Sequence, residues 1–188
     1  LVAMERDGDS SLQTGEKLLF MPNALTYLFS GNASAEYTIA STSQLCDANT
    51  GTWAKKMIEG LDLPMAILPD IVPPCTVVGE LREAICEELK CDPVPFILVG
   101  SHDTASAVAA VPATTGKSWA YLSSGTWSLL GVELDKPLIS DAGLAANYTN
   151  EGGVGGKIRF LKNIMGMWLI QESRSEWRRQ GQNYTFDE

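Results

Sequence analysis

Residues 94–100 are the segment that most constrains the fold of this chain. The segment is short and apolar and is bounded by proline and glycine, so it predicts a buried β-strand. It is followed by Ser101, His102, Asp103 and Thr104. A run of small residues over 105–110 then predicts a helix. A buried strand that turns directly into a helix is typical of open α/β sheets, which bind ligands at the carboxyl ends of their strands.

Asp103 is the most informative residue of this turn. A carboxylate at the end of a buried strand is expected to be partly desolvated and to be held by nearby N–H groups. Such a group can accept the proton of a substrate hydroxyl while that oxygen attacks an electrophile. The simpler alternative is that Asp103 only caps the helix that follows.

The rest of the chain mixes helices and strands, which predicts the α/β class. Helices are expected over residues 16–30, with Pro22 in a first turn and Gly31 as a stop, and over 52–61, 79–90 and 163–179. Strands are expected over residues 119–123 and 127–132, and an irregular crossing over 63–78. Residues 112–116 are the best candidate for a linker, so we divide the chain into residues 1–113 and 114–188.

Two glycine-containing segments follow this linker. The turn Ser124-Gly125-Thr126 can direct successive N–H groups and the Thr126 hydroxyl at phosphate oxygens, although it also suits an ordinary hairpin. Residues 152–156 form either a flexible hairpin tip or a loop that lets the backbone approach a ligand. In the last predicted helix, Asn163 and Gln171 lie slightly more than two turns apart and share a face. Asn and Gln in a helix are more often surface residues than ligand contacts.

The charge balance excludes several classes of partner. The 188 residues carry a formal net charge of −9, so the chain lacks the broad positive field that nucleic acids and anionic membranes require. No stretch approaches the roughly 18 apolar residues of a membrane span, and we expect a cytoplasmic protein. A bound nucleotide would have to be held locally, by backbone N–H groups, a few basic side chains or a metal ion.

Cysteine and histidine limit the metal and redox chemistry. The four cysteines are Cys46, Cys75, Cys86 and Cys91. None of them forms a C-x-x-C pair, so we expect reduced thiols with no metal site and place Cys86 on a buried helix face. A single histidine, His102, excludes a multi-histidine metal site. A Ser-His-Asp hydrolase is disfavoured because His102 and Asp103 are adjacent and point differently, and because no G-x-S-x-G elbow is present.

Four strings of the sequence together resemble the FGGY family of carbohydrate kinases. They are GSHDTASAV at 100–108, AYLSSGTWS at 120–128, NYTNEGG at 147–153 and RFLKNIMGMWLIQ at 159–171. The aspartate motif and the S-G-T turn are common to many members. The strings HDTASA, SSGTWS and LKNIMG are more particular to the branch that acts on L-rhamnulose. The resemblance extends over essentially the whole chain.

The resemblance implies a two-lobed, actin-like and ribonuclease-H-like fold in which sugar and ATP meet between the lobes. Residues 1–113 would then be the C-terminal part of the sugar-binding lobe, and residues 114–188 the N-terminal part of the nucleotide-binding lobe. The implied reaction is the phosphorylation of the C1 hydroxyl of L-rhamnulose in L-rhamnose catabolism, with ATP and Mg²⁺ as cofactors and with no nucleic-acid or membrane partner.

The resemblance also implies roles for individual residues. Asp103 matches the proton acceptor of the family. Substrate contacts are matched by His102, Asp103, Thr104 and Asn163, and ATP contacts by Gly125, Thr126 and Gln171. No metal ligand is matched. Composition and spacing independently favour only Asp103 and Thr126, whereas Asn163 and Gln171 depend on the resemblance alone.

The sequence departs from the family by omission. The family's N-terminal glycine-rich turn with its acidic residue, and its later glycine-rich segment at the adenine, have no counterpart here. We therefore expect an internal fragment with little or no kinase activity of its own. Two alternatives are an FGGY kinase for another ketose or polyol, such as xylulose, and a non-catalytic actin-like module that binds sugar or nucleotide.

Overall fold

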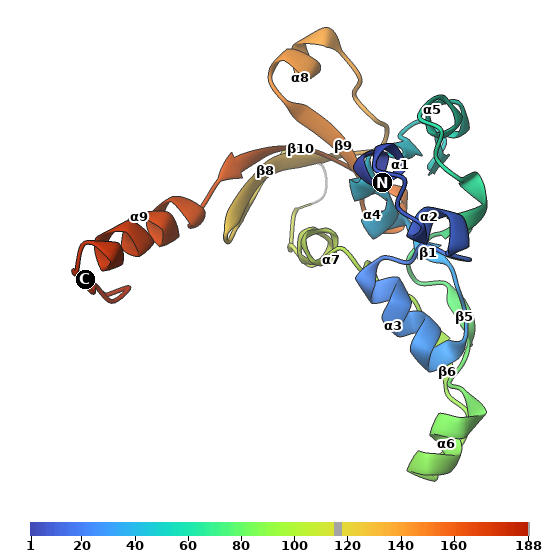
Figure 1. Cartoon of the computed structure of the whole chain (residues 1–188). Coiled ribbons are helices and arrows are strands. Elements are labelled where there is room, and N and C mark those ends of the chain that lie inside the picture. The colour runs from blue at the N-terminus through green and yellow to red at the C-terminus, as the bar shows by residue number, and fades with distance from the viewer. Residues whose placement is uncertain (115–117, 188) are drawn as a thin grey trace.

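The computed structural model describes residues 1–114 and 118–187 of the chain, so Thr115 and Gly116 of the expected linker lie outside it (Figure 1). The α-helices are α1 (Val2–Arg6), α2 (Ser11–Thr14), α3 (Met21–Ser30), α4 (Tyr37–Ala40), α5 (Lys55–Gly60), α6 (Glu83–Leu89), α7 (Asp103–Ala109), α8 (Asp141–Ala145) and α9 (Trp168–Arg179). The 3-10 helices are η1 (Ser41–Ser43), η2 (Met65–Ile67) and η3 (Val154–Gly156).

The strands form one four-stranded sheet and three two-stranded ones. They are β1 (Ala35–Glu36), β2 (Cys46–Asp47), β3 (Thr52–Trp53), β4 (Ile71–Val72), β5 (Val77–Glu80), β6 (Pro95–Ile97), β7 (Tyr121–Ser124), β8 (Trp127–Leu134), β9 (Tyr148–Gly152) and β10 (Ile158–Met165). The large sheet is antiparallel in the order β7-β8-β10-β9. Of the small sheets, β1-β4 is parallel, whereas β2-β3 and β5-β6 are antiparallel. The mixed α/β class is therefore confirmed.

Helix α7 lies between the four-stranded sheet and the N-terminal elements, while α6 and α9 project at opposite ends of the molecule (Figure 1). The helix packs on the sheet through a buried cluster of Val108, Tyr121 and Leu161. A separate core in the N-terminal part contains Leu12, Ile58, Leu63, Ile67 and Leu68. Burial of such apolar side chains stabilises each part, and the first cluster holds the C-terminal end of α7 against the sheet.

Several predicted elements are confirmed. Helix α3 has proline in its first turn and ends at Gly31, which adopts a left-handed conformation with φ of 80°. Strands β7 and β8 are joined by Gly125 and Thr126, as the sequence predicted. Residues 152–156 connect β9 and β10 in an antiparallel pair, and thus form a hairpin tip. Cys86 is buried on α6, and all four cysteines are free thiols.

Other predictions are wrong in part, and strand pairing accounts for two of the shortened helices. Thr52–Trp53 and Val77–Glu80 are strands, so the helices predicted over 52–61 and 79–90 are each shorter, and the helix predicted over 16–30 begins at Met21. The segment 94–100 contains the predicted strand, as β6, but this strand is not buried. Among the described residues β6 pairs only with β5, and Ile97 and Val99 remain 53% and 67% exposed. No helix in the described part of the chain is long and apolar enough to cross a membrane.

Strand β9 meets α4 and η1 through a close backbone approach at Gly152. Its N–H donates to the Ser41 hydroxyl over 2.8 Å, and a Cβ added at Gly152 would lie 2.6 Å from the ring of Tyr37. This contact joins the N-terminal elements to the four-stranded sheet, and it brings residue 151 to the boundary between them.

Gly152→Ala is therefore expected to lower the free energy of unfolding by about 1–3 kcal/mol, because the new methyl group overlaps the Tyr37 ring. Urea denaturation of the two proteins measures this difference. Gly60→Ala is the matched control, since its Cβ meets nothing within 4 Å at the end of α5 and should not destabilise the fold. Equal stability of the two variants would contradict the packing at Gly152.

Candidate functional site

A cavity of about 630 Å³ lies where the start of α7, the β7–β8 turn and strands β9 and β10 meet. Its lining residues are Thr42, His102, Asp103, Thr104, Ser123, Ser124, Gly125, Thr126, Trp127, Leu129, Glu151 and Asn163. The volume lies within the usual range for small-molecule sites. Every residue to which the family resemblance gives a role lines this cavity, with the exception of Gln171.

Asp103 is the first residue of α7, and its side chain faces the cavity. Its Oδ1 atom accepts a hydrogen bond from the N–H of Thr104 over 2.6 Å. The capping position is occupied by His102, so the alternative that Asp103 merely caps the helix is not what the structure shows. The expectation of partial desolvation is wrong, because the Asp103 side chain is 98% exposed within this chain.

His102 is held more firmly than its neighbour. Its side chain is only 19% exposed, and its Nδ1 atom lies 3.9 Å from Asp103 Oδ1, which is too long for a hydrogen bond. Burial lowers the pKa of His102, and the positive charge of Arg159 lowers it further, while the carboxylates of Glu151, Asp103 and Glu36 oppose the shift. The shift favours the uncharged imidazole. Because Nδ1 is buried, Nε2 is the ring nitrogen that can meet a ligand.

The lowered pKa of His102 predicts a loss of stability in acid. Between the lowered folded value and the ordinary value of 6.5, the unfolded chain binds more protons than the folded one. The stabilisation is thus complete above about pH 6.5 and decreases as the pH falls below it. His102→Gln should remove this part of the pH dependence in urea denaturation. Because the chain has one histidine, the imidazole proton resonance reports the pKa directly, and a value at or above 6.5 would contradict the prediction.

A buried carboxylate, Glu36, holds the turn that leads into α7. Its side chain is fully buried and accepts hydrogen bonds from the N–H and hydroxyl of Ser101 over 3.0 and 2.6 Å. It also accepts from the hydroxyl of Thr38 over 2.5 Å and from the N–H groups of Thr38 and Ile39. The Thr38 hydroxyl oxygen in turn accepts the N–H of His102 over 3.1 Å. The sequence analysis missed Glu36, because the Ser101 groups that connect it to the α7 turn are 65 positions away in the sequence.

The β7–β8 turn uses its backbone differently from the prediction. The Gly125 N–H donates to the carbonyl of Trp127 over 2.9 Å, so it is not free to face a phosphate. The carbonyls of Gly125 and Thr126 accept the N–H groups of Met167 and Trp168 over 3.0 and 3.1 Å, which anchors the start of α9. The prediction of successive free N–H groups is wrong at Gly125, whereas the exposed hydroxyls of Ser124 and Thr126 still line the cavity.

Asn163 and Gln171 do not share a helix face, contrary to the sequence prediction. Asn163 lies on β10, paired with Leu129, and lines the cavity. Gln171 lies on α9, which extends away from α7 (Figure 1), and it is outside the cavity lining. The apolar spacing of the segment is compatible with both conformations, and pairing with β8 decides for a strand up to Met165.

A buried ion pair on the sheet lies beside the cavity, and only its carboxylate partner, Glu151, lines it. Arg159 is fully buried on β10, and its Nη2 atom donates to Glu151 Oε2 over 3.0 Å. Its Nε atom donates to the carbonyl of Gly152 over 3.0 Å. Glu151, which is itself paired in register with Arg159, reaches the cavity. Both residues lie in family strings, at 147–153 and 159–171, but the sequence analysis assigned neither of them a role.

The sequence of the chain matches the two halves of one family of enzymes. Residues 4–110 match the profile of the N-terminal domain of the FGGY family of carbohydrate kinases, and residues 120–188 match that of its C-terminal domain. The chain therefore belongs to the FGGY family of carbohydrate kinases. This result agrees with the resemblance of the aspartate and S-G-T motifs, both of which line the cavity.

Within the family, the chain is similar to proteins named rhamnulokinase. It is 46% identical to the rhamnulokinase of Bacteroides thetaiotaomicron and 44% identical to that of Enterococcus faecalis, each over 94% of this chain. These matches cover 36% and 35% of the two relatives. The chain thus spans about a third of the length of the curated relatives it matches.

Solved structures confirm the actin-like fold of the family. A gluconate kinase from Lactobacillus acidophilus superposes with a TM-score of 0.75 at 18% identity, over 92% of this chain and 35% of that one. A xylulose kinase from the same organism superposes with a TM-score of 0.73 at 16% identity, over 91% and 34%. At these identities the similarity defines the fold and not the sugar.

Proposed function

We propose that the full-length gene product transfers the γ-phosphoryl group of ATP to the C1 hydroxyl of L-rhamnulose and forms L-rhamnulose 1-phosphate. The observation that carries this proposal is that one cavity is lined by Asp103, His102 and Asn163 and also by the residues of the β7–β8 turn. The 44–46% identity to rhamnulokinases supports the choice of sugar. The consumption of ATP and a small sugar is in keeping with a role in the cytoplasm.

Asp103 is the proton acceptor in this proposal. Its carboxylate takes the proton of the sugar hydroxyl while the hydroxyl oxygen forms a bond to the γ-phosphorus. The bond between the γ-phosphorus and the bridging oxygen breaks, and ADP leaves with that oxygen and its negative charge. His102 and Thr104 flank the carboxylate and contact the sugar, and Asn163 contacts it from the sheet.

The phosphoryl donor faces the other side of the cavity. The hydroxyls of Ser124 and Thr126 can donate to phosphate oxygens. An acidic chain has no positive field to attract an anion, so it needs such local hydrogen-bond donors. Gly125 keeps the turn tight, and we place Gln171 at the ATP on the resemblance alone.

The described residues contain no group of three acidic, histidine or cysteine side chains that could hold a metal. We therefore treat Mg²⁺ as part of the Mg-ATP substrate and derive no step through it.

A substrate panel tests this proposal. The full-length gene product is assayed for ADP formation with Mg-ATP and L-rhamnulose, xylulose or gluconate in turn. The expected result is the highest kcat/KM with L-rhamnulose. A preference for xylulose or gluconate would assign the protein to another sugar, and binding of sugar or ATP without ADP formation would assign it to the non-catalytic class.

A further inference from the structure

We propose that Glu151 is a sugar-binding residue, which Arg159 holds in place so that one carboxylate oxygen accepts a hydroxyl of the substrate. This inference rests on the proposed function, because it assumes a polyhydroxylated, uncharged ligand. It assigns a second carboxylate to the site beside Asp103, with a role in binding and not in proton transfer.

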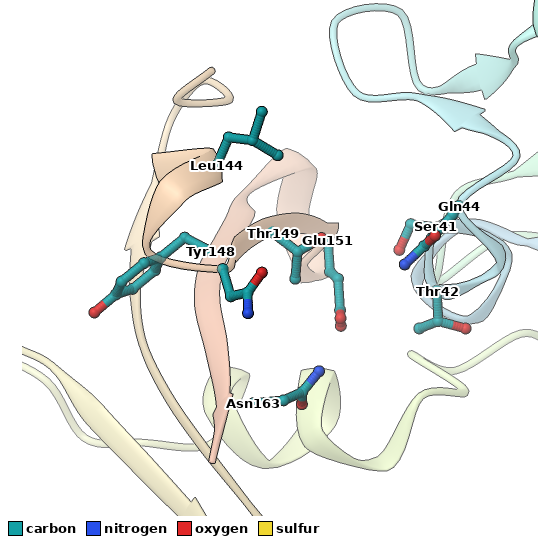
Figure 2. A pocket seen from close by; sticks show the side chains of 9 residues that line it. Ser41, Thr42, Gln44, Leu144, Tyr148, Thr149, Glu151 and Asn163 are labelled. Atoms are coloured by element: carbon teal, nitrogen blue, oxygen red, sulfur yellow. The ribbon is translucent and has the colours of Figure 1, made fainter. Parts of the chain in front are cut away.

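The position of Glu151 singles it out. It lines the cavity that contains Asp103 and also an adjoining cavity of about 450 Å³, so it lies where the two meet. Among the residues that the structure describes, Thr42 and Asn163 are the others that line both cavities. Figure 2 shows the Glu151 side chain extending from β9 into the space between Thr42 and Asn163. A ligand that occupies both cavities must therefore pass the Glu151 carboxylate.

Arg159 prepares this carboxylate for a ligand. The guanidinium is fully buried and binds Glu151 Oε2, whereas Glu151 Oε1 accepts no hydrogen bond from the described residues. The Glu151 side chain is 13% exposed, so its free oxygen is available only from the cavity side. A carboxylate this buried requires a paired charge, and Arg159 supplies it. The Glu151–Arg159 pair has no net charge, and it leaves Glu151 Oε1 as one oriented hydrogen-bond acceptor.

The surroundings favour a hydroxylated ligand over an anion. Apart from Glu151 and Leu144, the adjoining cavity is lined by uncharged polar residues, namely Ser41, Thr42, Gln44, Asn147, Tyr148, Thr149 and Asn163. The described lining of the adjoining cavity contains no basic side chain, which a phosphate site would need to pair its charge. Carboxylate, amide and hydroxyl groups together accept and donate hydrogen bonds to a sugar. Gln44 and Asn147 hold left-handed backbone conformations, with φ of 61° and 59°, where they face the cavity.

The experiment measures steady-state kinetics of the full-length gene product with Glu151→Gln. The exchange keeps the shape of the side chain but removes the charge that strengthens the bond to a hydroxyl. The KM for L-rhamnulose is expected to rise roughly tenfold or more. The KM for ATP should stay within about twofold, because the nucleotide lies at the other side of the cavity, and the change in kcat should be small.

Glu133→Gln is the matched control. Glu133 pairs in register with Arg159 on the other neighbouring strand but lines neither cavity. The KM of the Glu133→Gln variant for the sugar is expected to equal that of the wild type. Glu151→Asp keeps the negative charge that Arg159 requires but shortens the side chain by one methylene group. This variant should therefore retain the fold and still raise the KM for the sugar. Thermal unfolding of each variant, with and without sugar, separates misfolding from lost binding.

Sugar analogues that each lack one hydroxyl identify the contact. The wild type should bind one analogue more weakly than L-rhamnulose. Glu151→Gln should bind this analogue and L-rhamnulose with nearly the same affinity, because both changes remove the same hydrogen bond. An unchanged KM in Glu151→Gln and Glu151→Asp would overturn this inference and leave the kinase proposal intact. A wild-type protein that phosphorylates no sugar of the panel would instead overturn the proposed function.

Discussion

Asp103→Asn in the full-length gene product is expected to lower kcat for sugar phosphorylation by roughly 10²–10⁴-fold, while the KM for the sugar changes little. Asparagine has the shape of aspartate and still accepts the N–H of Thr104, but it cannot take a proton from the attacking hydroxyl. The Asp103 side chain is nearly fully exposed toward the cavity, so the exchange should not disturb the fold.

Coupled detection of ADP at saturating sugar measures this effect. Asp92→Asn is the matched control, because Asp92 is exposed next to Pro93 and does not line the cavity, so its kcat should equal that of the wild type. Sugar binding to Asp103→Asn, measured by calorimetry, should persist. Undiminished turnover of this variant would remove Asp103 from its role as proton acceptor.

Glu36→Gln is expected to lower the free energy of unfolding by about 3 kcal/mol and to reduce turnover as well. The carboxylate oxygens of Glu36 accept five hydrogen bonds, from Thr38, Ile39 and Ser101. A glutamine places an NH₂ group where one of these oxygens stood. Whichever way the amide turns, at least one buried N–H then faces another donor and loses its partner.

Urea denaturation measures the loss of stability, and Glu88→Gln on the exposed face of α6 is the control, with an expected change within about 0.5 kcal/mol. The loosened Ser101 turn should lower kcat, because His102 and Asp103 follow it directly. If Glu36→Gln unfolds like Glu88→Gln, Glu36 does not hold the turn.

Local signals in the sequence predicted part of the site. Asp103 was found because an apolar segment that turns into a small-residue helix predicts a ligand site at the turn. The Ser124 to Thr126 turn was found because a glycine separated two strand-like segments. Asn163 was found by resemblance but placed on a helix, since its segment has helical apolar spacing. Only its pairing with β8 makes it part of a strand.

The residues that hold the site in place could not be predicted in this way. Glu36 accepts three hydrogen bonds from its neighbours Thr38 and Ile39 as the cap of α4. Ser101 is 65 positions away, and its two donors reach Glu36 only when β1 and α4 pack beside the start of α7. Arg159 has the charge of a surface residue, but it is fully buried because Glu151 and the Gly152 carbonyl compensate it. Burial of a charge depends on its partners, which local sequence does not reveal.

The sequence by itself thus determined the α/β class, the motifs around Asp103 and Thr126, and the family to which the chain belongs, because motifs and hydrophobic spacing are local properties. The tertiary structure decided which of these residues share a cavity. It brought His102, Asp103, Thr126 and Asn163 together, left Gln171 apart on α9, and showed Glu36, Glu151 and Arg159. The physical reason is that hydrogen bonds and ion pairs between distant segments form only after the sheet and α7 have packed.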